Sequence, residues 1–352
     1  MSNLLLRRRN LLIKEQDDVN IRAVCFKADG EQTVAITKVG AAPDITMQYS
    51  YNGKTWDTWD LSPLSFSDST KVYVRGVGNT SFGSYSSKYN TFVFGTDAYV
   101  YISGIIESLL DGENEVLVLN SSYMFMHLFS QQTALRSVEN LKFEAQTIES
   151  DKSFIYGSMF SGCTNLLYAP KILPAQNLLG GYCYGSMFED CTSLITAPKL
   201  PATTVSRSAY QYMFQRCTSL VNAPELPATT LDSQCYQYMF QGCTSLINAP
   251  KLPATTLANQ CYQYMFRGCT SLVNVPELPA TTLRGGCYLY MFEGCKKLNT
   301  IRCRAKVTAT NATHLWLSGV KTLGTLYGYS EYGWSSGASG IPSGWEFVEL
   351  TD

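Results

Sequence analysis

Charged side chains are scarce in this chain of 352 residues, in which Asp, Glu, Lys and Arg together make up 16%. A typical soluble domain has about a quarter, and the formal net charge here is only −1. Nucleic-acid binding requires clustered Lys and Arg that displace counterions from phosphates. We therefore expect no nucleic-acid partner.

Histidine is almost absent, since His127 and His314 are the only two in the chain. No two cysteines have the close spacing of a structural zinc site. Ser, Asp and His also form no recognisable motif of a nucleophile with its base. The sequence therefore predicts no metal, no cofactor, no catalytic residue and no enzymatic activity.

Long apolar runs are missing as well. Three arginines separate Leu4–Leu6 from Leu11–Ile13, whereas a secretory signal has its positive residues first and a longer apolar run after them. This order predicts neither a secretory signal nor membrane insertion. Residues 1–18 are either a frayed terminus or a docking segment on a larger assembly. The docking residues would be Leu4, Leu5, Leu6, Arg7, Arg8, Arg9, Leu11 and Leu12.

Residues 19–104 show apolar and polar side chains in alternation, as at Val34 and Ile36 and again at Val72 and Val74. This period of two indicates short β-strands. Asn52-Gly53 supplies the positive φ angles of a hairpin turn. Several short strands at such spacing predict a small β-sandwich.

Repetition dominates residues 105–303. A Met-Phe pair begins at Met159, Met187, Met213, Met239, Met265 and Met291, and a weaker copy around Phe129 precedes them. Back-to-back blocks of 26 residues, such as Cys217–Gly242 and Cys243–Gly268, are typical of a solenoid. The predicted fold is therefore β-rich α+β: a sandwich, then a solenoid of six to seven units, then a cap.

Each repeat divides into two parts. Thr218–Ala223 favours an extended strand because Pro224 prevents a helix from continuing through it. Cys235–Gln241 is expected to be a short helix that ends at Gly242. On a helical wheel the core face would hold Cys235, Tyr236, Met239, Phe240 and Cys243, and the surface Gln237, Tyr238 and Gln241. The residue after the proline alternates in charge through Lys199, Glu225, Lys251 and Glu277, which favours one register of the stack.

Most of the twelve cysteines recur in two columns eight residues apart. Across a helix that separation is about 12 Å, too far for a disulfide within one repeat. Bonds between neighbouring repeats are not excluded by distance, but Ala209 interrupts the second column without a paired loss. Reduced, buried thiols are the preferred interpretation, which fits synthesis in a reducing cytoplasm.

The candidate ligand-binding residues form a row on the expected outer side of the repeats. They are Tyr212, Tyr238, Tyr264 and Tyr290 with Gln211, Gln237 and Gln263. Rings beside amides can bind a sugar or a protein with large contact area. The alternative is that the row recurs only because repeats copy themselves, and that it packs against neighbouring repeats or subunits.

Residues 304–352 lack the repeat. Trp316, Trp334 and Trp345 are expected to cover the open end of the solenoid as a cap.

The repeats, with their CTSL, APELPATTL and CYQYMF segments, resemble the leucine-rich repeat family of BspA type from about Phe129 to Cys303. With a β domain in front and the tail Ile341–Trp345, the chain is similar to proteins of gut Bacteroidales bacteria and of their phages and prophages. The resemblance implies either a phage virion protein that attaches to the host or a bacterial surface adhesin. The partners would be other virion proteins at the N-terminus and a host protein or glycan. A homotrimer is expected only by analogy with phage fibres.

Overall fold

The computed structural model describes residues 21–149, 151–174, 180–306, 309, 311–330 and 333–351. It is rich in strands, and the only helical element with described bounds is the 3₁₀-helix η1, Ile106–Leu109. The strands are β1 (Val24–Ala28), β2 (Gln32–Val39), β3 (Met47–Ser50), β4 (Asp57–Trp59), β5 (Leu64–Phe66), β6 (Val72–Gly76), β7 (Gly83–Tyr85), β8 (Lys88–Phe94), β9 (Val100–Ile105), β10 (Val118–Leu119), β11 (Leu135–Lys142), β12 (Thr147–Ile148), β13 (Thr204–Val205), β14 (Thr230–Leu231), β15 (Thr300–Arg302), β16 (Gly324–Gly328) and β17 (Trp345–Glu349).

The N-terminal part contains two sheets that pack on each other. A six-stranded sheet has the order β11-β9-β1-β6-β3-β4, and a four-stranded sheet has the order β5-β2-β8-β7. Phe26 of the first sheet contacts Phe92 and Phe94 of the second at ring-centroid distances of 5.2 and 5.5 Å. The apolar positions of β2 and β6 that the alternation singles out are buried, so period-two patterning identified these strands correctly.

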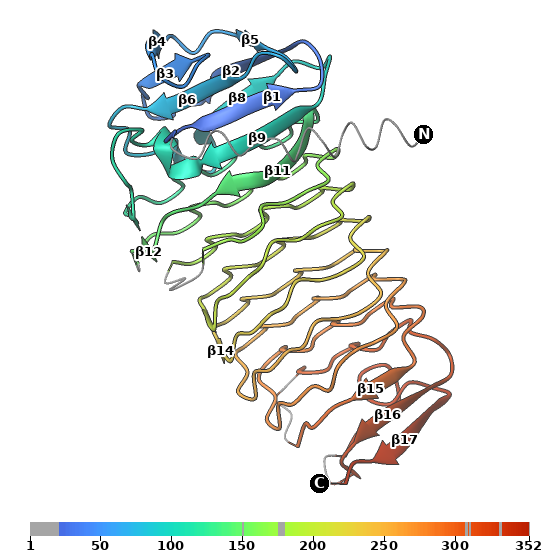
Figure 1. Cartoon of the computed structure of the whole chain (residues 1–352). Coiled ribbons are helices and arrows are strands. Elements are labelled where there is room, and N and C mark those ends of the chain that lie inside the picture. The colour runs from blue at the N-terminus through green and yellow to red at the C-terminus, as the bar shows by residue number, and fades with distance from the viewer. Residues whose placement is uncertain are drawn as a thin grey trace.

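The middle of the chain is a stack of coils (Figure 1). Parallel bridges between single residues join successive coils in register, as from Asn222 to Asn248 and from Asn248 to Asn274. The stack is continuous with the first sheet, because β11 pairs with β9 and Ser137 of β11 bridges to Tyr168. One hydrophobic core accordingly runs from Val24 to Trp345.

The prediction of a short helix at Cys235–Gln241 is wrong. Gln234, Tyr238 and Gly242 have positive φ angles of 61°, 60° and 74°, so every fourth residue is left-handed. A left-handed residue breaks a right-handed helix, and the segment is instead three consecutive tight turns. The same spacing of positive φ recurs in eight coils, at 123–131, 154–162, 182–190, 208–216, 234–242, 260–268, 286–294 and 311–319.

The backbone hydrogen bonds of this three-turn segment alternate in direction. The N–H groups of Tyr236, Tyr238, Phe240 and Gly242 donate to carbonyls of the next coil over 2.8–3.0 Å. The intervening N–H groups, such as that of Met239, donate to the carbonyl three residues earlier. Half of the donors therefore close turns and half join coils, which satisfies the backbone without a helix or a long strand.

Side chains at equivalent positions form columns inside the stack. Met239, Phe240 and their counterparts are fully buried, and successive Phe rings stack nearly parallel at 5.5–5.6 Å. All twelve cysteines are buried, and the eleven from Cys163 to Cys303 form no disulfide. In the first cysteine column each thiol donates to the carbonyl of a Phe in the preceding coil over 3.0–3.1 Å. The core residues that the repeat pattern indicates are thus correctly placed.

The coil geometry continues after Cys303, where the sequence rhythm stops. Asn311, Leu315 and Gly319 repeat the left-handed pattern, and Phe292 N–H donates to the carbonyl of Trp316 over 2.9 Å. Trp316 is fully buried, and its ring stacks between Tyr288 and Trp334. Beyond it, β15-β16-β17 form a three-stranded parallel sheet at the end of the stack (Figure 1).

Candidate binding face

Tyr212, Tyr238, Tyr264 and Tyr290 form a half-buried column on the three-turn segments. Each is the left-handed residue of the middle turn, with φ between 55° and 60°. Adjacent rings lie 4.5–4.8 Å apart between centroids and are nearly parallel, at 6–14°. The ring faces therefore cover one another, and a ligand can reach the ring edges and hydroxyl groups but not the faces.

The phenol groups of Tyr212, Tyr238 and Tyr264 are uncharged at neutral pH, because the pKa of each lies above the ordinary value. Burial is the main cause that raises the pKa of Tyr238 to about 12, and the neighbouring phenols of Tyr212 and Tyr264 add to it. Burial also raises the pKa of Tyr212, and Glu189 and Tyr182 act in the same direction. The column consequently offers neutral hydrogen-bond donors and acceptors.

The amides that the sequence places beside the rings are not on the surface. Gln211, Gln237 and Gln263 are only 6–7% exposed. Their side chains form a ladder along the stack, in which the Nε2 of Gln211 donates to Oε1 of Gln237, and Nε2 of Gln237 donates to Oε1 of Gln263. The expectation of surface amides is therefore wrong: the tight turns bury these three side chains, whereas a helix would place them opposite the core face.

Sequence reasoning also missed a second row of rings. Tyr85, Tyr123, Phe154 and Tyr182 follow one another at centroid distances of 5.9, 5.1 and 4.6 Å. Tyr123, Phe154 and Tyr182 occupy the first turn of the earlier coils, four residues before the position of the Tyr column, and Tyr85 ends β7. The last ring of this row, Tyr182, lies in the coil that precedes the coil of Tyr212, one turn before the position of the Tyr column. The signal in the sequence was an aromatic residue that recurs at the first-turn position, four residues before the position of Tyr238 and its counterparts.

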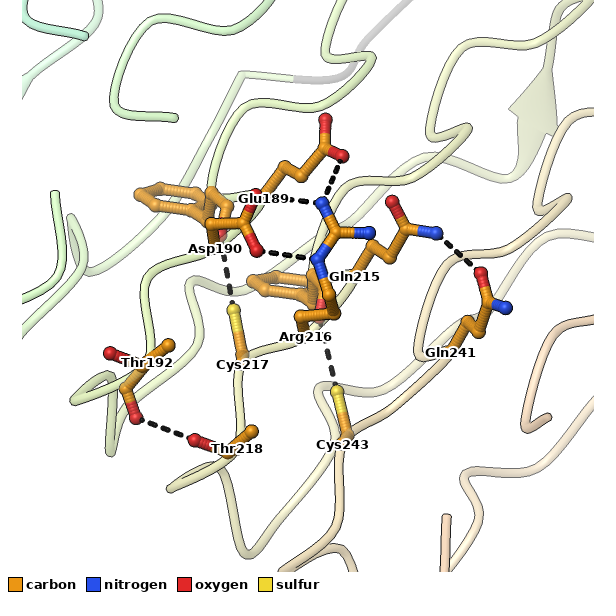
Figure 2. Close-up of polar contacts among 11 residues, drawn as sticks. Glu189, Asp190, Thr192, Gln215, Arg216, Cys217, Thr218, Gln241 and Cys243 are labelled. Atoms are coloured by element: carbon orange, nitrogen blue, oxygen red, sulfur yellow. Dashed lines mark hydrogen bonds and ion pairs between the residues drawn. The ribbon is translucent and has the colours of Figure 1, made fainter. Parts of the chain in front are cut away.

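Ion pairs border the Tyr column at the third turn. Most coils have Gly at the left-handed position there, but Asp190 and Arg216 replace it in two adjacent coils. Their side chains pair across the coils, with Arg216 Nε donating to Asp190 Oδ1 over 2.5 Å, and a second guanidinium nitrogen contacts Glu189 at 2.8 Å (Figure 2). The same view shows Gln215 bonded to Gln241. A polar, charged border thus lies beside the neutral rings.

The thiols offer no nucleophile to this face. Burial raises the pKa of Cys163 and Cys269 to about 12, and it holds the other thiols of the stack above their usual range as well. A thiol is reactive only as the thiolate. The twelve cysteines are therefore core residues.

Residues 184–316 match the family model of the BspA type leucine rich repeat region, in 6 copies. No curated protein and no solved structure matches the chain. The matched BspA type repeats include the whole Tyr column, and they extend past Cys303 to Trp316, in agreement with the coil geometry there. Repeats of this family are typical of surface or adhesion-type proteins, and they are usually non-enzymatic binding or scaffold units.

The remaining predicted site residues are those of the N-terminal docking segment. Leu4, Leu5, Leu6, Arg7, Arg8, Arg9, Leu11 and Leu12 fall outside the described residues. Among the residues that the structure does describe, no helix combines the length and apolar character that crossing a membrane requires.

Proposed function

We propose that this protein is a non-enzymatic attachment protein, in which a solenoid of BspA type repeats binds a host-surface protein or glycan and an N-terminal β-sandwich acts as spacer. The observation that carries the proposal is the Tyr column, continued by the first-turn row of rings on the earlier coils. Two rows of ring edges along successive coils favour an extended ligand over a compact one.

The particle that carries the protein is proposed to be a phage virion, with the N-terminal segment docked on other virion proteins. The eleven buried thiols from Cys163 to Cys303, which form no disulfide, support this choice. Exported proteins commonly form disulfides, whereas proteins that fold in a reducing cytoplasm keep free thiols. A phage protein folds in the host cytoplasm and leaves the cell in the particle.

A bacterial surface adhesin is the second candidate, favoured by the family match itself. The two candidates predict different locations. Peptide mass spectrometry of purified particles and of protease-shaved cells from one producing culture would separate them. Recovery from shaved intact cells, with none in particles, would refute the virion role and leave the adhesin.

Binding is tested with the purified chain on candidate host cells. Changing Tyr238 and Tyr264 to Phe removes two hydroxyls and leaves the stacked rings in place. Since a hydrogen bond contributes about 0.5–1.5 kcal/mol, we expect about tenfold weaker binding. The control changes Thr229 and Thr255 to Ala, because these side chains are exposed on another segment of the same coils.

A variant with all four tyrosines of the column changed to Ala extends the test to the ring edges. Its fold is checked by urea unfolding. If this folded variant binds host cells as tightly as the unchanged chain does, the Tyr column is not the binding face.

A further inference from the structure

A second surface, on the extended segment of each coil, carries an exposed aliphatic row. Ile195, Val221, Ile247 and Val273 are 44%, 40%, 42% and 37% exposed. Backbone hydrogen bonds hold them in register, as from Val273 N–H to the Ile247 carbonyl over 2.9 Å. A contiguous apolar row on a soluble surface marks an interaction site more often than scattered apolar residues do.

The row is flanked, four residues further along each coil, by a row of charges: Lys199, Glu225, Lys251 and Glu277. The alternation of sign predicts ion pairs between neighbouring coils. That prediction is wrong, because among the described residues Lys199, Glu225 and Lys251 make no ion pair, and Glu277 pairs with Arg302 and Arg304 instead. The central charges of the row are therefore available to another molecule.

Both rows alternate in the same phase, since the two coils with Ile carry Lys and the two with Val carry Glu. A two-fold axis midway between the second and third of these coils would place Glu225 opposite the partner's Lys251. It would also place Val221 opposite the partner's Ile247, so that each contact joins a larger to a smaller side chain and a negative to a positive charge. A parallel alignment in register would instead place each charged side chain opposite the identical side chain of the partner, so that like charges meet.

We propose that this aliphatic row is the interface of an antiparallel homodimer, in which the four coils that begin at Cys191, Cys217, Cys243 and Cys269 pack against the same coils of a second copy. An isologous contact of this kind closes on itself, whereas a parallel contact shifted by one coil also matches charges but leaves an open end. The proposal goes beyond the attachment role and does not depend on it, because the Tyr column lies on a different segment of each coil.

The size of the contact predicts how it behaves. Four coils at the spacing of paired strands span about 14 Å, which is short for a standard protein–protein interface. We therefore expect a dimer that forms reversibly as the concentration rises.

The experiment measures mass against concentration by analytical ultracentrifugation. Glu225→Lys and Lys251→Glu each place like charges together twice per dimer, and we expect each to raise the dissociation constant at least tenfold. The double variant Glu225→Lys/Lys251→Glu restores opposite charges, and its dissociation constant should return to within about threefold of the original. Glu346→Lys, exposed on β17, makes the same charge change away from the interface and should have no effect.

Ile247→Asp tests the apolar row independently of the charges and should also yield monomer. A chain that stays monomeric at millimolar concentration, a trimer or open-ended assembly, or a double variant as weak as the single ones would each overturn the proposal.

Discussion

Gln237 provides the sharpest test of how the stack is held together. Its amide accepts from Gln211 and donates to Gln263 while the residue is 6% exposed. Gln237→Ala would leave one buried donor and one buried acceptor without partners, at about 1–3 kcal/mol each. It would also remove one buried methylene, at about 0.8 kcal/mol. Water that enters the gap left by the side chain can satisfy part of the unpaired groups and lower this cost. We therefore expect the free energy of unfolding to fall by about 3 kcal/mol.

The assay is urea unfolding followed by tyrosine fluorescence, with Gln241→Ala as the matched control. Gln241 lies in the same coil but is half-buried and has one amide neighbour, Gln215, so its loss should cost about 1 kcal/mol. Both variants replace Gln by Ala in the same coil, so a difference between them reports the burial of the amide and not the type of residue removed. If Gln237→Ala costs no more than Gln241→Ala, the ladder contributes nothing and the packing argument fails.

Three further predictions concern single positions. Gly242→Ala should cost about 1 kcal/mol in urea unfolding because its φ is 74°, whereas Gly285→Ala, which has no positive φ, should be neutral; equal effects would contradict the turn geometry. Burial raises the pKa of the Glu107 carboxyl above its ordinary 4.5, so its neutral form stabilises the fold at low pH and this contribution is lost as the pH rises through the raised pKa. Relative to Glu107→Gln, the unchanged chain should therefore lose stability above about pH 4.5 in a pH series of unfolding curves, and parallel curves would refute this. A chromogenic disulfide reagent should react with none of the thiols, Cys163 and Cys269 included, until denaturant is added, because these groups are buried; prompt reaction of several thiols would show an open stack.

Much of the fold could be predicted from the sequence because its signals are local or repeated. The period of 26 residues fixes which side chains form columns, so the burial of Met239, Phe240 and Cys243 follows without knowledge of the backbone. The alternation at Val34 and Ile36 likewise identifies a strand with one buried face. These predictions depend on which residues recur and not on how the chain turns between them.

The predictions that failed depended on backbone geometry. Cys235–Gln241 has the apolar spacing of a helix, but a stack of coils can supply hydrogen bonds between neighbouring repeats that an isolated segment cannot, and tight turns then compete with the helix. With tight turns in place of the helix, Gln237 is buried and not exposed, whereas Phe240 is buried in either geometry. A column of identical amides was the available signal, since Gln ladders require the same residue in each coil.

The candidate site was predicted in part for the same reason. Tyr238 recurs at one position and was found, whereas Phe154 and Tyr182 lie one turn earlier and differ in residue type. Only the left-handed turn positions show that both rows run along the same three-turn segments.

Half of the backbone N–H groups in each three-turn segment donate to carbonyls of the next coil. Each coil therefore satisfies the hydrogen bonds of its neighbour, and an additional coil could be bound in the same way. Inserting a single 26-residue copy between Gly242 and Cys243 would lengthen the molecule by about 5 Å and leave both end sheets intact. It would, however, shift the alternation of Lys and Glu by half its period on one side of the insertion. Insertion of two copies would preserve that alternation. Proteins with an even or an odd number of inserted copies should therefore differ in how well their charges match in the proposed dimer.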